Sequence, residues 1–261
     1  MELRLERLAG DDAGIVLLGL DRPTAKNALG RQLMIEFRQA LADLRSDPAA
    51  RVVALHSLVP GVFCAGADLK ERAGMSPAET ATFVHGLRAA FTELEDLPMP
   101  VIAVLEGAAF GGGLELALAA DLRVAGAEAR MGLVETALAI IPGAGGTQRL
   151  PRLIGVSRAK ELIFTARRIG AAEAERLGLV DRVAPAGGAL DAALALAREI
   201  LPNGPVALRM AKLAVNRGLG LGLGAGLAFE QACYAQVIPT KDRLEGLAAF
   251  RDKRKPHYRG E

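Results

Sequence analysis

The chain alternates short, wholly apolar runs with longer stretches whose apolar residues recur at helical spacing. Runs at 14–20, 52–56 and 101–105 are apolar at almost every position, which is typical of strands buried on both faces. A shorter run at 122–124 has the same character. Helical spacing between the first two runs predicts a helix over 31–46. Its apolar positions are Leu33, Met34, Phe37, Leu41 and Leu44.

A second helix start precedes the 101–105 run. Ser76 is a capping residue, Pro77 suits the first helical position, and Glu79 can complete a capping box. These residues predict a helix that continues to about Leu97. Because strand, turn and helix follow one another repeatedly, the pattern predicts an α/β fold with parallel strand pairing.

From Gln148 onward the pattern predicts mostly helices. The predicted ranges are 157–165, 171–177, 189–201, 206–216, 227–237 and 241–251. A break at 201–205, with two prolines and a glycine, divides the chain into a core domain at 1–204 and a C-terminal helical region at 205–261. Glycines alternate with other residues from Gly218 to Gly226, which indicates a flexible connector or a frayed helix start, not a phosphate loop.

Composition narrows the class of protein. The 261 residues are 51% hydrophobic and 24% charged, with a net charge of +2, which is ordinary for a globular protein and does not indicate nucleic acid or a membrane as partner. Two cysteines make neither a disulfide framework nor a metal-ligand pattern, so we expect no metal site. No signal peptide or membrane span is visible. We therefore expect a cytoplasmic protein, or a mitochondrial-matrix protein if a targeting segment has been removed.

The residues from 101 to 150 place two carboxylates beside two glycine-rich turns. Glu115 follows the turn at 111–113, and Glu135 precedes the turn at 142–146. Glycine lets the backbone turn sharply, and the first N–H groups of the helix that follows have no partner within it. Carboxylates that transfer protons, next to N–H donors for a developing oxyanion, suit chemistry on an acyl group.

Less specific interpretations of single residues remain open. Glu115 could be a solvated helix residue, although its leucine neighbours disfavour exposure. Glu135 could simply be the cap of a helix, without a catalytic role. We interpret Cys64 as a buried packing thiol and His56 as a structural residue at a strand end. No dinucleotide fingerprint, Walker A loop or nucleophile elbow is present.

Three ordered segments, at 61–71, 110–117 and 131–150, resemble the signatures of the enoyl-CoA hydratase/isomerase (crotonase) superfamily. The segment at 235–246 looks most like the methylglutaconyl-CoA hydratase branch. The resemblance covers essentially the whole chain. It implies a crotonase-type spiral of repeated strand–strand–helix units, followed by a C-terminal helical trimerisation region. The chain would then form a homotrimer or a dimer of trimers (a hexamer).

The resemblance also implies roles for four residues. Backbone N–H groups of Ala67 and Gly112 would hold the thioester oxygen, while Glu115 and Glu135 would hold one water between them. One glutamate would activate that water for attack on C3, and the other would protonate C2. Isomerases of the superfamily commonly keep only the carboxylate that matches Glu135. Two carboxylates therefore favour an enoyl-CoA hydratase over the alternative, an isomerase of the same fold.

The acyl-CoA thioester would be the substrate, with coenzyme A as part of it and no separate cofactor. The resemblance suggests that five residues lie near the CoA moiety, namely Ala25, Lys26, Ala65, Asp68 and Leu69. Tyr234 and Lys253 match positions that reach the CoA of a neighbouring subunit. The pathway would be fatty-acid or branched-chain amino-acid (leucine) catabolism. The acyl group stays open, with Arg72 a candidate for contacting a distal substrate carboxylate.

A second alternative is an RNA-binding homologue of the hydratase. A member of this branch binds AU-rich RNA through lysines on an early helix, and the matching positions here are Ile35, Gln39 and Arg45. Only one of the three is basic. Because phosphate binding depends on positive charge, RNA is an unlikely partner.

Overall fold

A computed structural model describes residues 1–261, and its core consists of two β-sheets. The larger sheet has the strand order β1 (Leu3–Arg7), β2 (Ile15–Leu20), β3 (Val52–Ser57), β5 (Val101–Leu105), β7 (Leu122–Gly126) and β10 (Arg182–Ala184). The smaller sheet has the order β4 (Val62–Cys64), β6 (Ala108–Phe110), β8 (Arg130–Gly132) and β9 (Ile169–Gly170).

The two sheets are built from a repeated unit. In β3–β4, β5–β6 and β7–β8 the first strand joins the large sheet, the second joins the small sheet, and helices follow. The pairs β2–β3, β3–β5, β5–β7 and β7–β10 are all parallel. The predicted α/β fold with parallel pairing and strand–strand–helix units is therefore confirmed, with β1–β2 and β8–β9 as antiparallel additions.

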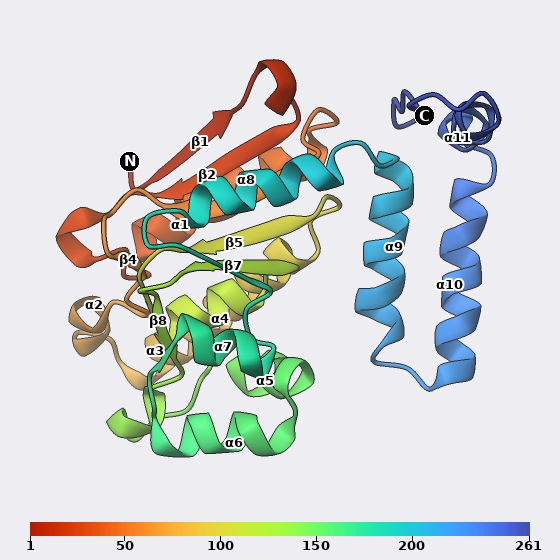
Figure 1. The fold of residues 1–261 in the computed structure, drawn as a ribbon. Helices are drawn as coiled ribbons and strands as arrows, with labels where there is room; N and C mark the ends of the chain where they lie inside the picture. Colours follow the sequence, from red (N-terminus) through yellow and green to blue (C-terminus); the bar gives the residue numbers. More distant parts are fainter.

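The core has eight helices, and α8 lies across one face of the large sheet (Figure 1). They are α1 (Arg31–Ser46), α2 (Leu69–Ala73), α3 (Pro77–Glu95), α4 (Gly112–Leu118), α5 (Gly146–Ile154), α6 (Val156–Thr165), α7 (Ala171–Leu177) and α8 (Ala189–Ile200), with short 3-10 turns η1 (Gly10–Asp12), η2 (Pro23–Ala25) and η3 (Glu135–Leu138). Helix α8 packs Ala193 and Ala197 on one face, and α1 and α3 belong to the larger apolar core on the other. Strands covered on both faces need apolar residues at every position, which explains their continuous runs.

Local signals fixed several helix ends. Helix α1 occupies the predicted range, and α3 begins with the predicted capping box, in which the Ser76 hydroxyl accepts from Glu79 N and the Glu79 carboxylate accepts from Ser76 N. The region after Gln148 is less purely helical than predicted, because it also contains β9 and β10. These strands have two and three residues, too few to show an apolar period.

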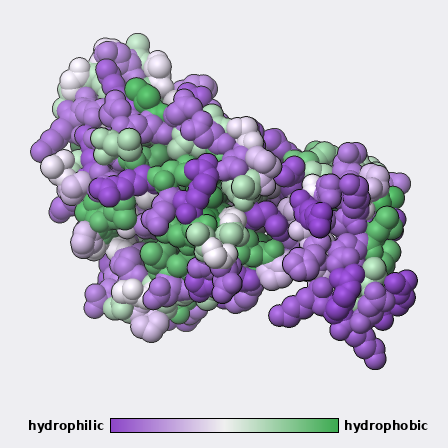
Figure 2. Space-filling model, turned by 90° about the horizontal axis from the view of Figure 1, so that it is seen from above, coloured by the Kyte–Doolittle hydropathy of each residue, from purple (hydrophilic) through white to green (hydrophobic).

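The C-terminal helices α9 (Pro205–Gly218), α10 (Leu223–Val237) and α11 (Lys241–Arg251) stand apart from the core (Figures 1 and 2). Lys212 of α9 reaches back to the core, where its Nζ lies 2.7 Å from Asp121 Oδ2. The glycine-rich stretch supplies the link at 219–222, but Gly224 and Gly226 lie inside α10. A Cβ on Gly226 would lie 3.3 Å from the Gly218 carbonyl oxygen, so glycine lets α9 and α10 approach closely. None of the chain's helices combines the length and apolarity needed to cross a bilayer.

Candidate active site

The turn between β6 and α4 carries the first glycine-rich segment. Gly111 has φ of 52°, the left-handed region that favours glycine, and it is followed at once by the first turn of α4. A Cβ on Gly111 would lie 3.2 Å from Glu135 Oε1. Glycine at this position therefore both shapes the turn and leaves room for the second carboxylate.

Glu115 projects from the first turns of α4 and is only 3% exposed. Its Oε1 accepts hydrogen bonds from Ala144 N at 2.8 Å and from Gly146 N at 2.7 Å. Burial raises the pKa of the Glu115 carboxyl, while the two N–H donors partly oppose that rise. The prediction that Glu115 is not a solvated helix residue is confirmed, and its donors come from the second glycine-rich turn, not from its own helix.

Two arginines hold that second turn. Arg88 of α3 donates from Nε and Nη2 to the Gly143 carbonyl oxygen at 3.1 and 2.8 Å. Arg149 of α5 donates from Nη1 to the Ala144 carbonyl oxygen at 3.2 Å, and its Nη2 lies 2.6 Å from Glu95 Oε2. With the carbonyls fixed outward, the N–H groups of the turn point at Glu115. Sequence reasoning missed both arginines, although Arg149 lies inside the third signature segment.

Glu135 opens η3, directly after β8, and has different surroundings. Its side chain is buried, yet neither carboxyl oxygen has a hydrogen-bond partner. Burial and the nearby charge of Glu115 raise the pKa of Glu135 to about 7. The possibility that Glu135 serves only as a helix cap does not explain a carboxylate whose oxygens bond to no backbone group.

Ala67 and Gly112 meet beside these carboxylates. Leu29 N donates to the Gly66 carbonyl at 2.8 Å and Asp68 N donates to the Leu29 carbonyl at 3.2 Å, which leaves the Ala67 N–H between them without a partner in the chain. Gly112 is the first residue of α4, so its N–H has no acceptor within the helix. A Cβ on Gly112 would lie 3.5 Å from Ala67 N. The two predicted oxyanion donors are therefore neighbours in space.

The structure brings together most of the residues predicted near CoA. The Ala65 N–H donates to the Lys26 carbonyl at 3.1 Å, and Leu69 is exposed at the start of α2. The Asp68 side chain, however, is buried and occupied: it caps α2 by accepting from Lys70 N and Glu71 N.

Tyr234 and Lys253 do not join this group within one chain. Tyr234 lies on α10 and is 64% exposed, and Lys253 follows α11. Both therefore belong to the part of the chain that stands apart from α4 (Figure 1).

Cys64 and His56 have structural surroundings. The Cys64 thiol is fully buried and donates to the Asn27 carbonyl at 3.0 Å, and burial raises its pKa to about 12. Such a thiol is no nucleophile, so the predicted packing role is confirmed. His56 lies in β3, where burial lowers its pKa by disfavouring the charged imidazolium.

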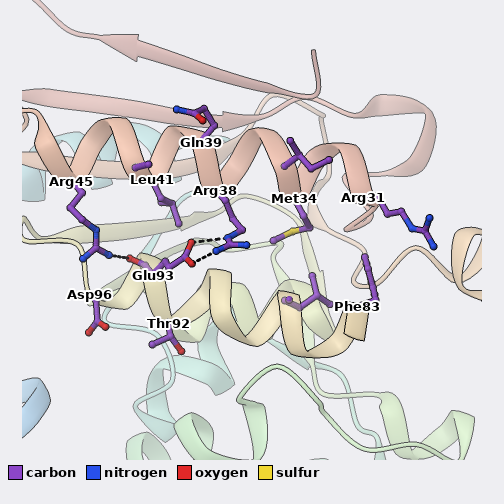
Figure 3. Close-up of a pocket in the computed structure, with 14 residues that line it drawn as sticks. Arg31, Met34, Arg38, Gln39, Leu41, Arg45, Phe83, Thr92, Glu93 and Asp96 are labelled. Atoms are coloured by element: carbon purple, nitrogen blue, oxygen red, sulfur yellow. Dashed lines mark hydrogen bonds and ion pairs between the residues drawn. The ribbon is translucent and has the colours of Figure 1, made fainter. Parts of the chain in front are cut away.

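A groove of about 950 Å³ lies elsewhere, between α1 and α3 (Figure 3). Ile35, Gln39 and Arg45 all line it. Arg45 Nη2 donates to the Glu93 carbonyl at 3.2 Å, and Arg38 forms a two-pronged ion pair with the Glu93 carboxylate. The arginines Arg38 and Arg45 of this groove are thus already bound to α3.

No group of three His, Cys, Asp or Glu side chains in the chain is arranged to hold a metal ion.

Comparison with known proteins gives consistent matches. A sequence model of the family described as enoyl-CoA hydratase/isomerase matches residues 10–261. The human protein named methylglutaconyl-CoA hydratase, mitochondrial, is 56% identical over 264 residues, covering 100% of this chain and 78% of the relative. The Arabidopsis thaliana protein named probable enoyl-CoA hydratase 2, mitochondrial, is 53% identical over 258 residues, covering 99% and 86%. The crystal structure of an enoyl-CoA hydratase from Bacillus anthracis has a TM-score of 0.97 at 47% identity and covers 100% of both chains.

Proposed function

The chain belongs to the enoyl-CoA hydratase/isomerase family, and on that premise we propose that it adds water across the 2,3 double bond of an enoyl-CoA thioester. One observation carries the proposal: two buried carboxylates with opposite hydrogen-bonding surroundings lie near two neighbouring backbone N–H groups, those of Ala67 and Gly112. One carboxylate would suffice to move a single proton between carbon atoms. A pair suits the addition of water, in which a base and an acid act together.

In the proposed reaction the thioester oxygen lies against the N–H groups of Ala67 and Gly112. Attack at C3 pushes electron density through C2 onto that oxygen, and donors placed in advance stabilise the charge. Each such donor typically contributes about 3–4 kcal/mol to lowering the barrier. Small residues at both positions let the carbonyl approach the backbone.

The surroundings of the two glutamates assign their roles. Hydrogen bonds to Glu115 favour its charged form, so it is the base that takes a proton from water as the water oxygen bonds to C3. Glu135, whose pKa is raised to about 7, keeps a protonated fraction near neutral pH and delivers this proton to C2. The double bond is consumed, one C–O and one C–H bond form, and a proton returns from Glu115 to Glu135 before the next turnover.

The relatives suggest the acyl group. Because the human relative is named methylglutaconyl-CoA hydratase, we assign 3-methylglutaconyl-CoA as a substrate and leucine catabolism as the pathway. Arg72 of α2 is the candidate for contacting its distal carboxylate. Coenzyme A arrives as part of the substrate, with no separate cofactor. The human and Arabidopsis relatives are named as mitochondrial, which agrees with the matrix alternative for this chain.

Residues 205–261 are proposed to form the oligomer, a homotrimer or a dimer of trimers, around the core at 1–204. Helix α9 has no fully buried residue, and apolar atoms lie along the outer edge of this smaller lobe (Figure 2). Large apolar side chains exposed within residues 205–261 include Leu219, Leu223, Leu227 and Phe250. Exposed patches of this kind mark interaction surfaces. In the oligomer Tyr234 and Lys253 would contact the CoA of a neighbouring copy. Light scattering that finds an active monomer at micromolar concentration would contradict this assembly.

The activity is tested with a steady-state panel of enoyl-CoA thioesters, from crotonyl-CoA to long-chain and 3-methylglutaconyl-CoA. Loss of the conjugated thioester absorbance reports hydration directly. We expect hydration of the panel, with 3-methylglutaconyl-CoA among the substrates of highest kcat/KM. Absence of hydration with every member, or double-bond migration in its place, would contradict the proposal.

A further inference from the structure

Arg22 lies at the centre of a cluster of three carboxylates, one of which belongs to Asp68, the residue after Ala67. Its Nε lies 2.8 Å from Glu2 Oε1, its Nη1 lies 2.8 Å from Asp68 Oδ2, and its Nη2 lies 3.4 Å from Glu71 Oε1. The side chain is only 16% exposed. Nothing in the proposed reaction uses this arginine, although it contacts the residue next to Ala67.

Asp68 connects Arg22 to the donor. One carboxyl oxygen of Asp68 accepts from Lys70 N and Glu71 N at 3.0 and 3.1 Å, and the other pairs with Arg22. The Asp68 N–H is bound to the Leu29 carbonyl, so both its backbone and its side chain are fixed. The Ala67 N–H belongs to the Gly66–Ala67 peptide, whose carbonyl accepts from Leu29 N at 2.8 Å, and Asp68 fixes the peptide that follows it.

Arg22 also holds the opposite side of the same segment. Its Nη1 donates to the Ala28 carbonyl at 2.8 Å, directly before Leu29, which makes the isolated bridge with Ala67. The planar guanidinium therefore bonds at once to Asp68, the residue after Ala67, and to Ala28, the residue before the bridge partner Leu29. Nη1 makes both of these contacts while Nε and Nη2 pair with Glu2 and Glu71. A lysine has one charged nitrogen and cannot make the whole set in a fixed plane.

We propose that Arg22 is a positioning residue for the oxyanion donor: through Asp68 and the Ala28 carbonyl it fixes the direction of the Ala67 N–H. The inference rests on the proposed hydration of an enoyl-CoA. Arg22 does not touch the substrate. Loss of its contacts lets the Ala67 peptide reorient, which weakens the hydrogen bond to the thioester oxygen and lowers kcat more than it alters KM.

The test compares Arg22→Gln and Arg22→Lys with a matched control, Arg198→Gln. Arg198 of α8 makes an equally close two-pronged pair with Asp12, at 2.6 and 2.7 Å, but is not part of the site. The first readout is kcat and KM with crotonyl-CoA. The second is the infrared band of the ¹³C-labelled thioester carbonyl in bound butyryl-CoA, which has no double bond to hydrate and reports hydrogen bonding to the carbonyl oxygen.

For Arg22→Gln we expect kcat to fall about tenfold, KM to change by less than about threefold, and the carbonyl band to move toward its frequency in free butyryl-CoA. Arg22→Lys should lie between this variant and wild type, and it serves as the test if the glutamine variant does not fold. Arg198→Gln should match wild type in both readouts. A lower kcat with an unshifted carbonyl band would indicate a merely structural role and overturn the inference, as would unchanged kcat.

Failure of the proposed function gives a different result. Wild-type protein that shifts the carbonyl band of butyryl-CoA but hydrates no enoyl-CoA contradicts the hydratase proposal. The band in the Arg22 variants then still decides the positioning role, because it does not depend on turnover.

Discussion

The turn that surrounds Glu115 and the segment that carries Glu135 are both buried, yet they treat their carboxylates in opposite ways. At Glu115 two backbone N–H groups converge on one oxygen, and two arginines hold the turn that supplies them. At Glu135 no donor reaches either oxygen. Burial raises the pKa of both groups, but Glu115 accepts two hydrogen bonds from the second glycine-rich turn that stabilise its charge.

This difference shows how one site can hold an acid and a base made from the same side chain. When two carboxylates lie close together, repulsion disfavours ionising both, and the group with fewer donors keeps the proton. Glu135 is that group, because its only strong neighbour is the negative charge of Glu115. The division of roles thus depends on where backbone N–H groups point.

The largest expected effect follows from removing either carboxylate. Glu115→Gln and Glu135→Gln keep side-chain shape but abolish the base or the acid, so turnover of crotonyl-CoA should fall on the order of 10²–10⁴-fold. Glu175→Gln, an exposed residue of α7, serves as the control and should retain wild-type activity. Near-normal hydration by a folded variant at 115 or 135 would show that the pair is not catalytic.

Gly112→Pro tests the backbone N–H groups assigned to the thioester oxygen. Proline removes the N–H of residue 112, and the first position of a helix tolerates its ring, so α4 should persist. The turnover rate should then fall at least about 10²-fold. Gly112→Val keeps the N–H but adds a side chain whose Cβ would lie 3.5 Å from Ala67 N, the other proposed donor, so it should obstruct the carbonyl. Normal binding and turnover by the valine variant would exclude the assigned role of Gly112.

The raised pKa of Glu135 also predicts how stability depends on pH. The folded state holds this proton up to about pH 7, whereas the unfolded chain releases it near 4.5. The group therefore contributes stability below pH 4.5 that is lost as pH rises through 7. Urea unfolding of wild type and Glu135→Gln at pH 5 and pH 8 should show wild type losing stability relative to the variant. An equal difference at both pH values would mean that Glu135 has an ordinary pKa.

A smaller effect is expected from Arg88→Gln, which loosens the turn beside Glu115. Two hydrogen bonds to the Gly143 carbonyl are lost on an exposed surface, and a loss of about 1 kcal/mol corresponds to about a fivefold decrease in kcat. Arg152→Gln, on the neighbouring helix α5, is a suitable comparison because its contacts stay within one helix turn. Equal kcat values for Arg88→Gln and Arg152→Gln would show that Arg88 does not support Glu115.

Local patterns predicted the elements that carry the site. Apolar runs located β3 and β5, helical spacing located α1, and the leucines around Glu115 predicted its burial. Strand β1 was missed because it lies at the edge of the sheet and is largely exposed, so its sequence is mostly polar.

The contacts that distinguish the two glutamates could not be predicted in the same way. The hydrogen bond from Ala144 N to Glu115 joins residues 29 positions apart, and the one from Arg88 to the Gly143 carbonyl joins residues 55 apart. No period in the sequence encodes such pairs. The resemblance located Ala67 and Gly112. Only the folded structure shows that Arg22 pairs with Asp68, the residue after Ala67.

The most direct test is a pH titration of the Glu135 carboxyl itself. Infrared difference spectra of wild type against Glu135→Gln isolate the band of the protonated side chain, and Glu115→Gln supplies the second comparison. We predict a protonated Glu135 that titrates near pH 7 in wild type and at lower pH in Glu115→Gln, where the neighbouring charge is gone. A Glu135 that is already ionised at pH 5, or a proton that resides on Glu115 instead, would contradict the assignment of acid and base.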